Sequence, residues 1–336
     1  MHDRMRRREF LRRVGGGAAA VGLGRVLSAS AAEPAATTRE GLTIRDLPRK
    51  KLGRTGFLAP PLSIGLAHMG HAFYPPDEFE AVTHAAIDAG LTYLDVAPLY
   101  DVSQERLGPV LAKRRKEVFL VSKTNDPTRD GTLRLIDKSL RAMRTDRLDV
   151  CHLHNVGQFP TERVLGKGGM LEGLQVAKDR KLVRFLGATG HQNVRRFLPV
   201  LETEQIDVLM IVLNFADRHT YNFEERIVPR AREKGVAVVA MKVLGGVPGG
   251  WAGYRERRPG AFAGRHYDMA MRYALGLPDV ATMVLGIKSI EELRRAILAV
   301  RGYRPFSEAE KAEVLEEGRR LARERGEFHG PVGWDA

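Results

Sequence analysis

Eight short apolar segments rich in β-branched residues recur along this 336-residue chain, and amphipathic helical patterns separate them. Such alternation predicts parallel strands joined by right-handed helical crossovers, with one strand and one helix in about 30 residues. The predicted strands are Leu62–Leu66, Thr92–Asp95, Val118–Ser122, Leu148–His154, Val183–Thr189, Ile206–Leu213, Val236–Met241 and Ala281–Leu285. The predicted helices include Asp77–Ala89, Leu171–Arg180, Glu224–Lys234 and Ile290–Val300.

An open doubly wound sheet and a closed barrel would both give this alternation. The open sheet would be expected to carry a G-x-G-x-x-G turn after its first strand, and the sequence following Leu62–Leu66 has none. Eight strands and a body of about 250 residues suit a closed barrel. We therefore predict an α/β fold, a single-domain (β/α)8 TIM barrel, with a C-terminal helical tail at Ser307–Arg325 on its exterior.

The first 32 residues have a different character from the barrel. The whole chain carries a formal charge of +13, and seven arginines against two acids in residues 1–32 supply five of those units. Arg7 and Arg8 precede Phe10-Leu11 and a Gly/Ala-rich stretch, and a small-residue cleavage site follows at 29–31 or 30–32. This order resembles a twin-arginine export signal. A basic arm that binds RNA or lipid is the alternative, but it would not require this order of residues.

We therefore expect three parts in the chain: a signal peptide at residues 1–32, a polar linker at 33–47, and the barrel at 48–336. The twin-arginine translocation machinery is the expected partner, and the periplasm or another extracytoplasmic space is the expected location. The single cysteine, Cys151, excludes an intramolecular disulfide. No apolar run reaches about 18 residues, so no stable membrane insertion is expected after processing. Nucleic acid is not an expected partner either, because the basic excess is divided between the export signal, which carries five units, and phosphate recognition and a solvated surface in the rest of the chain.

Catalytic side chains of such a barrel come from the C-terminal ends of its strands and the loops that follow. Asp95, Lys123 and His154 lie at three predicted strand ends, and Tyr100 follows Asp95 in the next loop. A nearby ammonium group would favour phenolate and lower the pKa of Tyr100, and Asp95 could neutralise Lys123. His154 could orient a carbonyl oxygen. These four residue types suit a site that donates a proton where an alkoxide develops.

Seven segments in this order resemble the aldo-keto reductase family from about Lys51 to about Val300. They are KLGRTG (51–56), GLTYLDVAPLYDVSQERLG (90–108), VFLVSKT (118–124), LDVCHLHN (148–155), VRFLGATG (183–190), AMKVLGG (240–246) and LGIKSIEELR (285–294). The resemblance implies an eightfold barrel that binds NADPH and moves hydride between nicotinamide and an aldehyde, ketone or alcohol. It also implies that Asp95, Tyr100, Lys123 and His154 form the catalytic tetrad, with Tyr100 as proton donor.

The resemblance implies NADP(H), in preference to NADH, as the cofactor. Thr189, Met210 and Met241 match positions around nicotinamide, although the family more often has Ser-Asn, Gln and an aromatic residue there. Lys288, Ser289 and Arg294 match positions that recognise the 2′-phosphate. Lys242, Leu244 and Gly245 are candidate contacts to the pyrophosphate. The cofactor set is therefore Thr189, Met210, Met241, Lys242, Leu244, Gly245, Lys288, Ser289 and Arg294, with no metal expected.

Two other functions fit parts of the sequence. A non-catalytic redox sensor that binds NADPH would explain the reduced number of polar residues at the nicotinamide positions. A metal-dependent barrel hydrolase could use His152 and His154, which lie two apart and so on one face of a strand, with His68 as a third ligand. The hydrolase leaves Tyr100 and Lys123 without a role. The favoured interpretation is an exported NADP(H)-dependent oxidoreductase that acts on a small carbonyl compound or alcohol.

Overall fold

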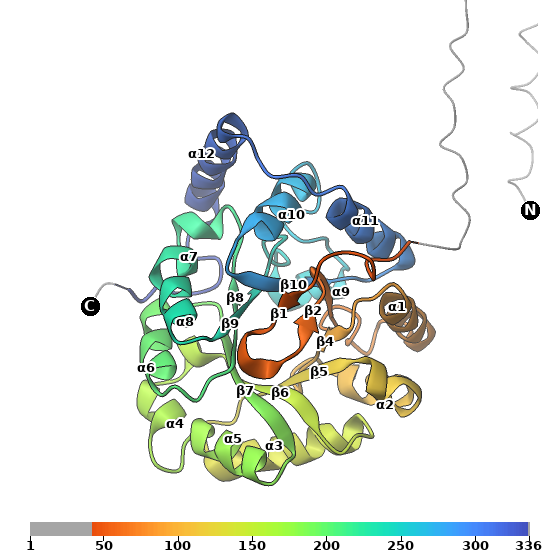
Figure 1. The fold of residues 1–336 in the computed structure, drawn as a ribbon, viewed down its shortest axis with the longest axis vertical. Coiled ribbons are helices and arrows are strands. Elements are labelled where there is room, and N and C mark those ends of the chain that lie inside the picture. Colours follow the sequence, from red (N-terminus) through yellow and green to blue (C-terminus); the bar gives the residue numbers. More distant parts are fainter. Residues whose placement is uncertain (1–41, 335–336) are drawn as a thin grey trace, which may run out of the picture. The chain divides into compact units, whose positions relative to one another are not determined.

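Eight parallel strands close into a barrel in the computed structural model, which describes residues 42–334 (Figure 1). Around the barrel the order is β10, β3, β4, β5, β6, β7, β8 and β9, so each strand pairs with its neighbour in the chain and β10 closes on β3. The barrel strands are β3 (Leu62–Gly65), β4 (Tyr93–Asp95), β5 (Phe119–Thr124), β6 (Leu148–His154), β7 (Val183–Gly190), β8 (Val208–Val212), β9 (Ala237–Met241) and β10 (Val280–Gly286). The predicted closed (β/α)8 barrel is confirmed.

Helices surround the strands and fill the intervals between them (Figure 1). They are α1 (Pro76–Asp88), α2 (Ser103–Arg114), α3 (Arg129–Ala142), α4 (Thr161–Leu165), α5 (Met170–Asp179), α6 (Phe197–Glu202), α7 (Phe223–Arg226), α8 (Val228–Glu233), α9 (Gly250–Arg255), α10 (Tyr267–Gly276), α11 (Ile290–Arg301) and α12 (Glu308–Arg325). Each longer helix buries one apolar stripe against the strands, as Phe79, Val82 and Ala86 do in α1.

The single helix predicted at Glu224–Lys234 is wrong, because the structure has α7 and α8 there with a break at Ile227. Pro229 lies in the first turn of α8. Proline lacks an N–H group and fits the first turn of a helix better than its interior, so α8 starts anew at Val228. The exterior tail helix is α12, and Ser307 begins it with a capping box that involves Glu310.

A small hairpin, which the sequence pattern did not predict, covers the N-terminal end of the barrel. Its strands β1 (Lys50–Lys51) and β2 (Leu58–Ala59) pair antiparallel, and Figure 1 shows them over the centre of the strand ring. The ring of Phe57 stacks on that of Phe119 in β5, with 4.2 Å between their centroids. Two-residue strands are too short to show a period-2 pattern in the sequence, so the hairpin is evident only from its backbone pairing and the packing of Phe57.

The folded part begins earlier than the predicted boundary at Pro48. Ile44 is fully buried, the hydroxyl of Thr43 donates to the Ala89 carbonyl at 3.0 Å, and the Arg45 guanidinium donates to the Ile87 carbonyl at 2.8 Å. These contacts attach residues 43–45 to the end of α1. The predicted signal at residues 1–32 lies outside the described residues, as does most of the predicted linker.

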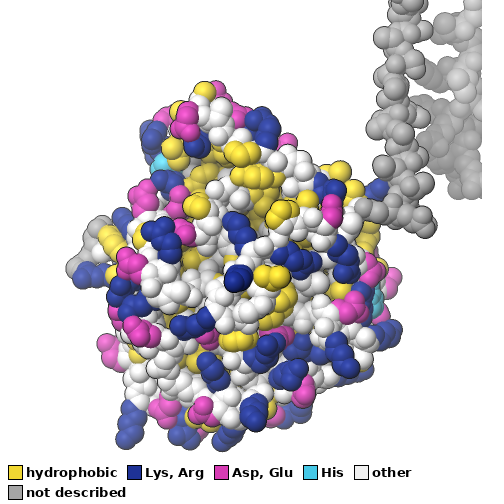
Figure 2. Space-filling model, viewed as in Figure 1, with side chains coloured by type: hydrophobic (Ala, Val, Ile, Leu, Met, Phe, Trp, Pro, Cys, Tyr) yellow, Lys and Arg dark blue, Asp and Glu magenta, His cyan; other side chains and the backbone are white. Residues whose placement is uncertain are grey.

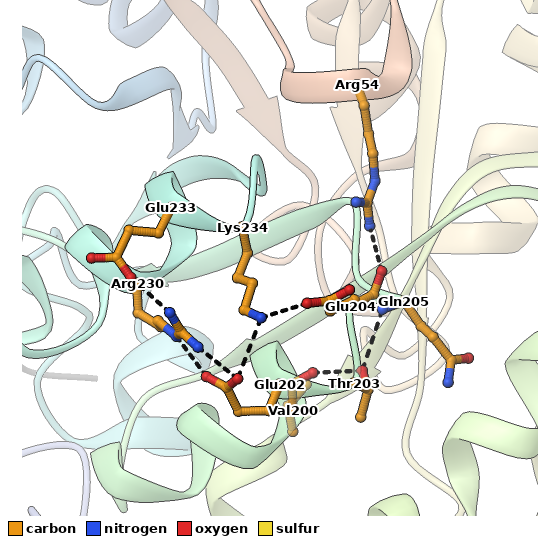
Figure 3. A network of polar contacts seen from close by, with 9 residues as sticks. All are labelled: Arg54, Val200, Glu202, Thr203, Glu204, Gln205, Arg230, Glu233 and Lys234. Atoms are coloured by element: carbon orange, nitrogen blue, oxygen red, sulfur yellow. Dashed lines mark hydrogen bonds and ion pairs between the residues drawn. The ribbon is translucent and has the colours of Figure 1, made fainter.

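Charged side chains at the N-terminal end of the barrel, which the hairpin covers, are largely paired. Figure 3 shows Arg230 with Glu202 and Lys234 with Glu204, and Arg54 donating to the Glu204 carbonyl at 3.0 Å. Arg54 also pairs with the buried carboxylate of Asp207 at 2.5 Å, which attaches the hairpin connection to the start of β8.

Figure 2 shows many Lys and Arg side chains on the hairpin-bearing face. A surface hollow lined by Arg147, Lys178, Lys181 and Arg184 adds to this basic character. None of the helices within residues 42–334 is long and apolar enough to span a membrane.

Candidate active site

A cleft opens at the C-terminal ends of the barrel strands. It holds about 1210 Å³ of empty space, with open solvent at its mouth included. All four predicted catalytic residues, Asp95, Tyr100, Lys123 and His154, line it. They come from the ends of β4, β5 and β6 and from the loop after β4, because parallel strands of a barrel deliver their C-terminal ends to one rim.

Lys123 and Asp95 form a buried ion pair at the base of the cleft. The Lys123 ammonium group donates to the Asp95 carboxylate at 2.6 Å and to the Val96 carbonyl at 3.0 Å. Only 1% of the Lys123 side chain is exposed. Burial raises the pKa of Asp95 and lowers the pKa of Lys123, and the attraction between the two charges opposes both shifts. Exclusion from water thus costs free energy here, and the charge attraction and the hydrogen bonds of Lys123 hold the pair together.

Tyr100 lies next to this pair, with the Lys123 ammonium 4.7 Å from the centre of its ring. The turn that carries it is packed tightly against the loop after β3. A Cβ on Gly70 would lie 2.5 Å from the Tyr100 carbonyl oxygen, and the Gly70 carbonyl accepts from the Val102 amide at 2.9 Å. These backbone contacts fix the ring over the Lys123 ammonium.

The predicted lowering of the Tyr100 pKa is wrong for this structure. Burial raises the pKa of the phenol well above 10, and the Asp95 carboxylate and the Tyr254 phenol add to the rise. Lys123, which is paired with Asp95, does not reverse this rise. Tyr100 consequently holds its proton throughout the neutral range.

His154 contributes an uncharged imidazole. Burial and the positive charges of Lys123 and Lys242 lower its pKa to about 3. Its Nδ1 atom is buried, and no hydrogen-bond partner for it lies within residues 42–334. The residue lines the cleft, where a neutral imidazole can hydrogen-bond a ligand atom.

Six of the predicted cofactor residues line the same cleft: Thr189, Met210, Met241, Lys242, Leu244 and Lys288. The Thr189 hydroxyl is directed to the sulfur of Met241 at 3.8 Å. The Lys288 ammonium lies 3.2 Å from the Glu292 carboxylate, which also lines the cleft.

Gly245, Ser289 and Arg294 are not among the lining residues. Gly245 has a left-handed backbone (φ 76°), and the Ser289 hydroxyl accepts from the Glu292 amide at the start of α11. Arg294 lines a separate hollow between α10 and α11, whereas the next residue, Arg295, lines the cleft. The Arg295 guanidinium lies over the ring of Tyr267 at 3.6 Å and donates to the Ala263 carbonyl at 3.0 Å. Adjacent helical residues point about 100° apart, so a shift of one position decides which arginine lines the cleft.

Several lining residues were missed as cofactor or substrate contacts by the sequence analysis, among them His191, Glu292 and Arg295. His68 was considered only as a metal ligand. It follows β3 by three residues, and burial together with the charges of Lys242 and Lys288 lowers its pKa to about 3. Its position just past a strand end was a signal for a cleft residue.

The metal-hydrolase alternative finds no support in the geometry. His152 is fully buried and is not a lining residue of the cleft. Among the residues that the structure describes, no group of three or more His, Cys, Asp or Glu side chains is placed to hold a metal ion. His152 packs instead inside the barrel against Gly187, where a Cβ would lie 2.2 Å from its Nδ1 atom.

A closed (β/α)8 barrel with a polar cleft at its C-terminal rim, containing a buried ion pair and a phenol, defines a barrel enzyme. The sequence model of the aldo/keto reductase family matches residues 61–267, and the chain belongs to this family.

The chain is similar to two named dehydrogenases, and one solved structure shares its fold. L-galactose dehydrogenase of Arabidopsis thaliana is 22% identical over 284 residues, covering 75% of this chain and 87% of that protein. D-threo-aldose 1-dehydrogenase of a Pseudomonas species is 24% identical over 227 residues, covering 56% and 67%. The crystal structure of an aldo-keto reductase from Klebsiella pneumoniae in complex with NADPH superposes with a TM-score of 0.65 at 20% identity, covering 81% of this chain and 95% of that one.

Proposed function

We propose that the protein is an NADP(H)-dependent oxidoreductase that reduces an aldehyde or ketone, or oxidises the corresponding alcohol. The observation that carries the proposal is the convergence of a protonated phenol, a buried Lys–Asp pair and a neutral imidazole in one cleft. The family membership supports it. The Klebsiella pneumoniae neighbours described with NADPH and with NADP support the choice of cofactor.

The residues of the cleft fit such a dinucleotide. Lys242 and Lys288 supply positive charge for its phosphates. The loop that begins at Lys242 includes Gly246, which lines the cleft and has no side chain to obstruct a ligand. His68 and His154 both line the cleft as uncharged imidazoles, and a neutral imidazole can hydrogen-bond to a ligand that fills it. Thr189 offers a hydroxyl close to the nicotinamide positions.

NADPH, when bound, supplies the hydride that reaches the carbonyl carbon. The chain supplies the rest of the chemistry. His154 donates a hydrogen bond to the carbonyl oxygen and orients it, and Tyr100 transfers its proton to that oxygen as negative charge develops. Lys123 stabilises the resulting phenolate, which then takes a proton from solvent. Asp95 acts through Lys123, because it holds the ammonium group beside the Tyr100 ring.

Oxidation of NADPH by carbonyl compounds tests this proposal. We expect stopped-flow absorbance to report loss of bound NADPH with at least one member of a panel of aldehydes and aldoses, with one alcohol formed for each NADPH consumed. Aldoses belong in the panel because two relatives are named as sugar dehydrogenases. Tight NADPH binding with no oxidation by any compound would instead indicate the sensor function.

We further propose that residues 1–32 direct export through the twin-arginine route, on the basis of Arg7, Arg8 and the segment that follows. Replacing both arginines by lysine keeps the charge and removes the guanidinium pair. We expect the wild-type chain fused to a reporter to reach the periplasm of a bacterial host, and the Arg7→Lys/Arg8→Lys chain to stay in the cytoplasm. Equal export of the two chains in cell fractionation would contradict the proposal.

A further inference from the structure

The last described residues, 325–334, form a segment that is fixed to the barrel along its length; we refer to it as the C-terminal segment. The amides of Asn193 and Val194 donate to the carbonyls of Pro331 and Val332 at 2.7 and 2.8 Å. The Tyr221 hydroxyl donates to the Gly330 carbonyl at 2.9 Å and accepts from the His329 amide at 2.7 Å. Four hydrogen bonds in a few residues hold this segment in one conformation.

Asp217 is the centre to which the C-terminal segment is attached. It is 2% exposed, and it belongs to a short helical turn, Asp217–His219, that α12 contacts. Its carboxylate accepts from the His329 imidazole at 3.1 Å and from the Asn214 amide at 2.6 Å, and the Arg325 guanidinium lies 3.6 Å away. Burial alone would raise the pKa of Asp217, but the bond from His329 and the charge of Arg325 lower it overall.

The same groups reach the loop Lys242–Gly246. Arg325 donates to the Gly245 carbonyl at 2.8 Å, and Asn214 donates to the Lys242 carbonyl at 3.0 Å. Phe328 and His329 close the outer side, because a Cβ on Gly246 would lie 3.1 Å from the former ring and 3.3 Å from the latter.

This loop has an unusual backbone that needs such support. Lys242, Gly245 and Gly246 all have positive φ, at 56°, 76° and 77°. For a lysine this conformation is costly, and it persists where the surrounding structure enforces it. The loop also contributes Lys242, Leu244 and Gly246 to the cleft. Support from outside therefore sets the shape of one wall of the cleft.

We propose that the C-terminal segment positions the loop Lys242–Gly246 for cofactor binding, with Arg325 and His329 as positioning residues attached through Asp217. Neither residue lines the cleft, so both act on the cofactor through the loop. Holding the loop in its bound shape before the ligand arrives lowers the ordering cost of binding. The inference rests on the proposed function insofar as the ligand is NADP(H).

The test compares Arg325→Gln with Arg323→Gln, which removes the same charge from an exposed position of α12 two residues earlier. Hydrogen exchange of the amides of residues 243–246 is measured in the ligand-free proteins, and NADPH affinity is measured by fluorescence titration. We expect Arg325→Gln to accelerate exchange in this loop and weaken NADPH binding about tenfold, as loss of a charge-assisted hydrogen bond would. Arg323→Gln should change neither.

His329→Phe is the second variant, which keeps an aromatic ring beside Gly246 and removes the bond to Asp217. It should also accelerate exchange in the loop and weaken NADPH binding, and it provides the test if Arg325→Gln fails to fold. A lower Tm with unchanged loop exchange and unchanged NADPH affinity would overturn the inference and leave a purely structural role. Failure of the wild type to bind NADPH would refute the proposed cofactor, whereas the exchange comparison would still decide whether the segment positions the loop.

Discussion

Replacing Tyr100 by phenylalanine should lower kcat for carbonyl reduction about a thousandfold or more while NADPH affinity stays within about twofold. General acid catalysis by a positioned group contributes roughly 10² to 10⁴ in rate, and this substitution removes only the proton donor. The ring that Lys123 contacts is kept, so the packing of the cleft should persist. Steady-state kinetics and fluorescence titration of the two proteins measure both quantities. Equal loss of NADPH binding and turnover would contradict the role of Tyr100 as acid.

The pH dependence follows from the environment of the phenol. Because burial raises the pKa of Tyr100 well above 10, the acid form predominates below that value. His154, with its pKa lowered to about 3, does not change charge above mildly acidic pH. Carbonyl reduction should therefore have a kcat that is nearly constant from about pH 6 to about pH 9. Alcohol oxidation needs the deprotonated phenol, so its rate should rise with pH across this range. A loss of reduction with a midpoint near pH 7 would assign the proton donor to another group.

The strand positions and the four candidate catalytic residues could be predicted because both depend on local order in the chain. A buried strand shows its apolar run directly, and a barrel then brings strand ends such as Asp95, Lys123 and His154 to one rim. The direction of the Tyr100 pKa could not be predicted in this way. It depends on how much water the folded loops exclude and on the distances of the Asp95 carboxylate and the Tyr254 phenol, which only the three-dimensional arrangement reveals.

Three other features of the structure could not be predicted from the sequence, for related reasons. The choice between Arg294 and Arg295 depends on the rotation of α11 about its axis, which an ordered set of sequence matches does not determine. The contact of Arg325 with Gly245 joins residues 80 positions apart. No periodicity of the chain encodes such a pairing. The hairpin is defined by the stacking of Phe57 on Phe119 rather than by a strand pattern.

Lys123→Met should be the most destabilising single change in the cleft. It leaves the Asp95 carboxylate, 4% exposed, without its partner, and breaking one side of a buried ion pair costs about 3–5 kcal/mol. Removing the ammonium also removes the charge and the hydrogen bond that contribute most to keeping the pKa of Asp95 from rising further. When the pKa of an acid is higher in the folded state than in the unfolded state, the folded protein loses stability as pH rises from the unfolded-state pKa towards the folded-state pKa. The deficit of Lys123→Met in urea unfolding should therefore be larger at pH 8 than at pH 5.

Adding Asp95→Leu to Lys123→Met separates stability from catalysis. The double variant lacks both charges of this buried pair, and apolar replacement of a buried ion pair is often neutral or stabilising. We expect its free energy of unfolding to recover most of what Lys123→Met loses. The extra pH dependence that Lys123→Met introduces should disappear. Turnover should nevertheless stay as low as in Lys123→Met, because no cation is left beside the Tyr100 ring to stabilise the phenolate. Recovery of both stability and turnover would show that the pair serves the fold alone. Recovery of stability without turnover would indicate that the chain retains a costly buried ion pair for its chemistry.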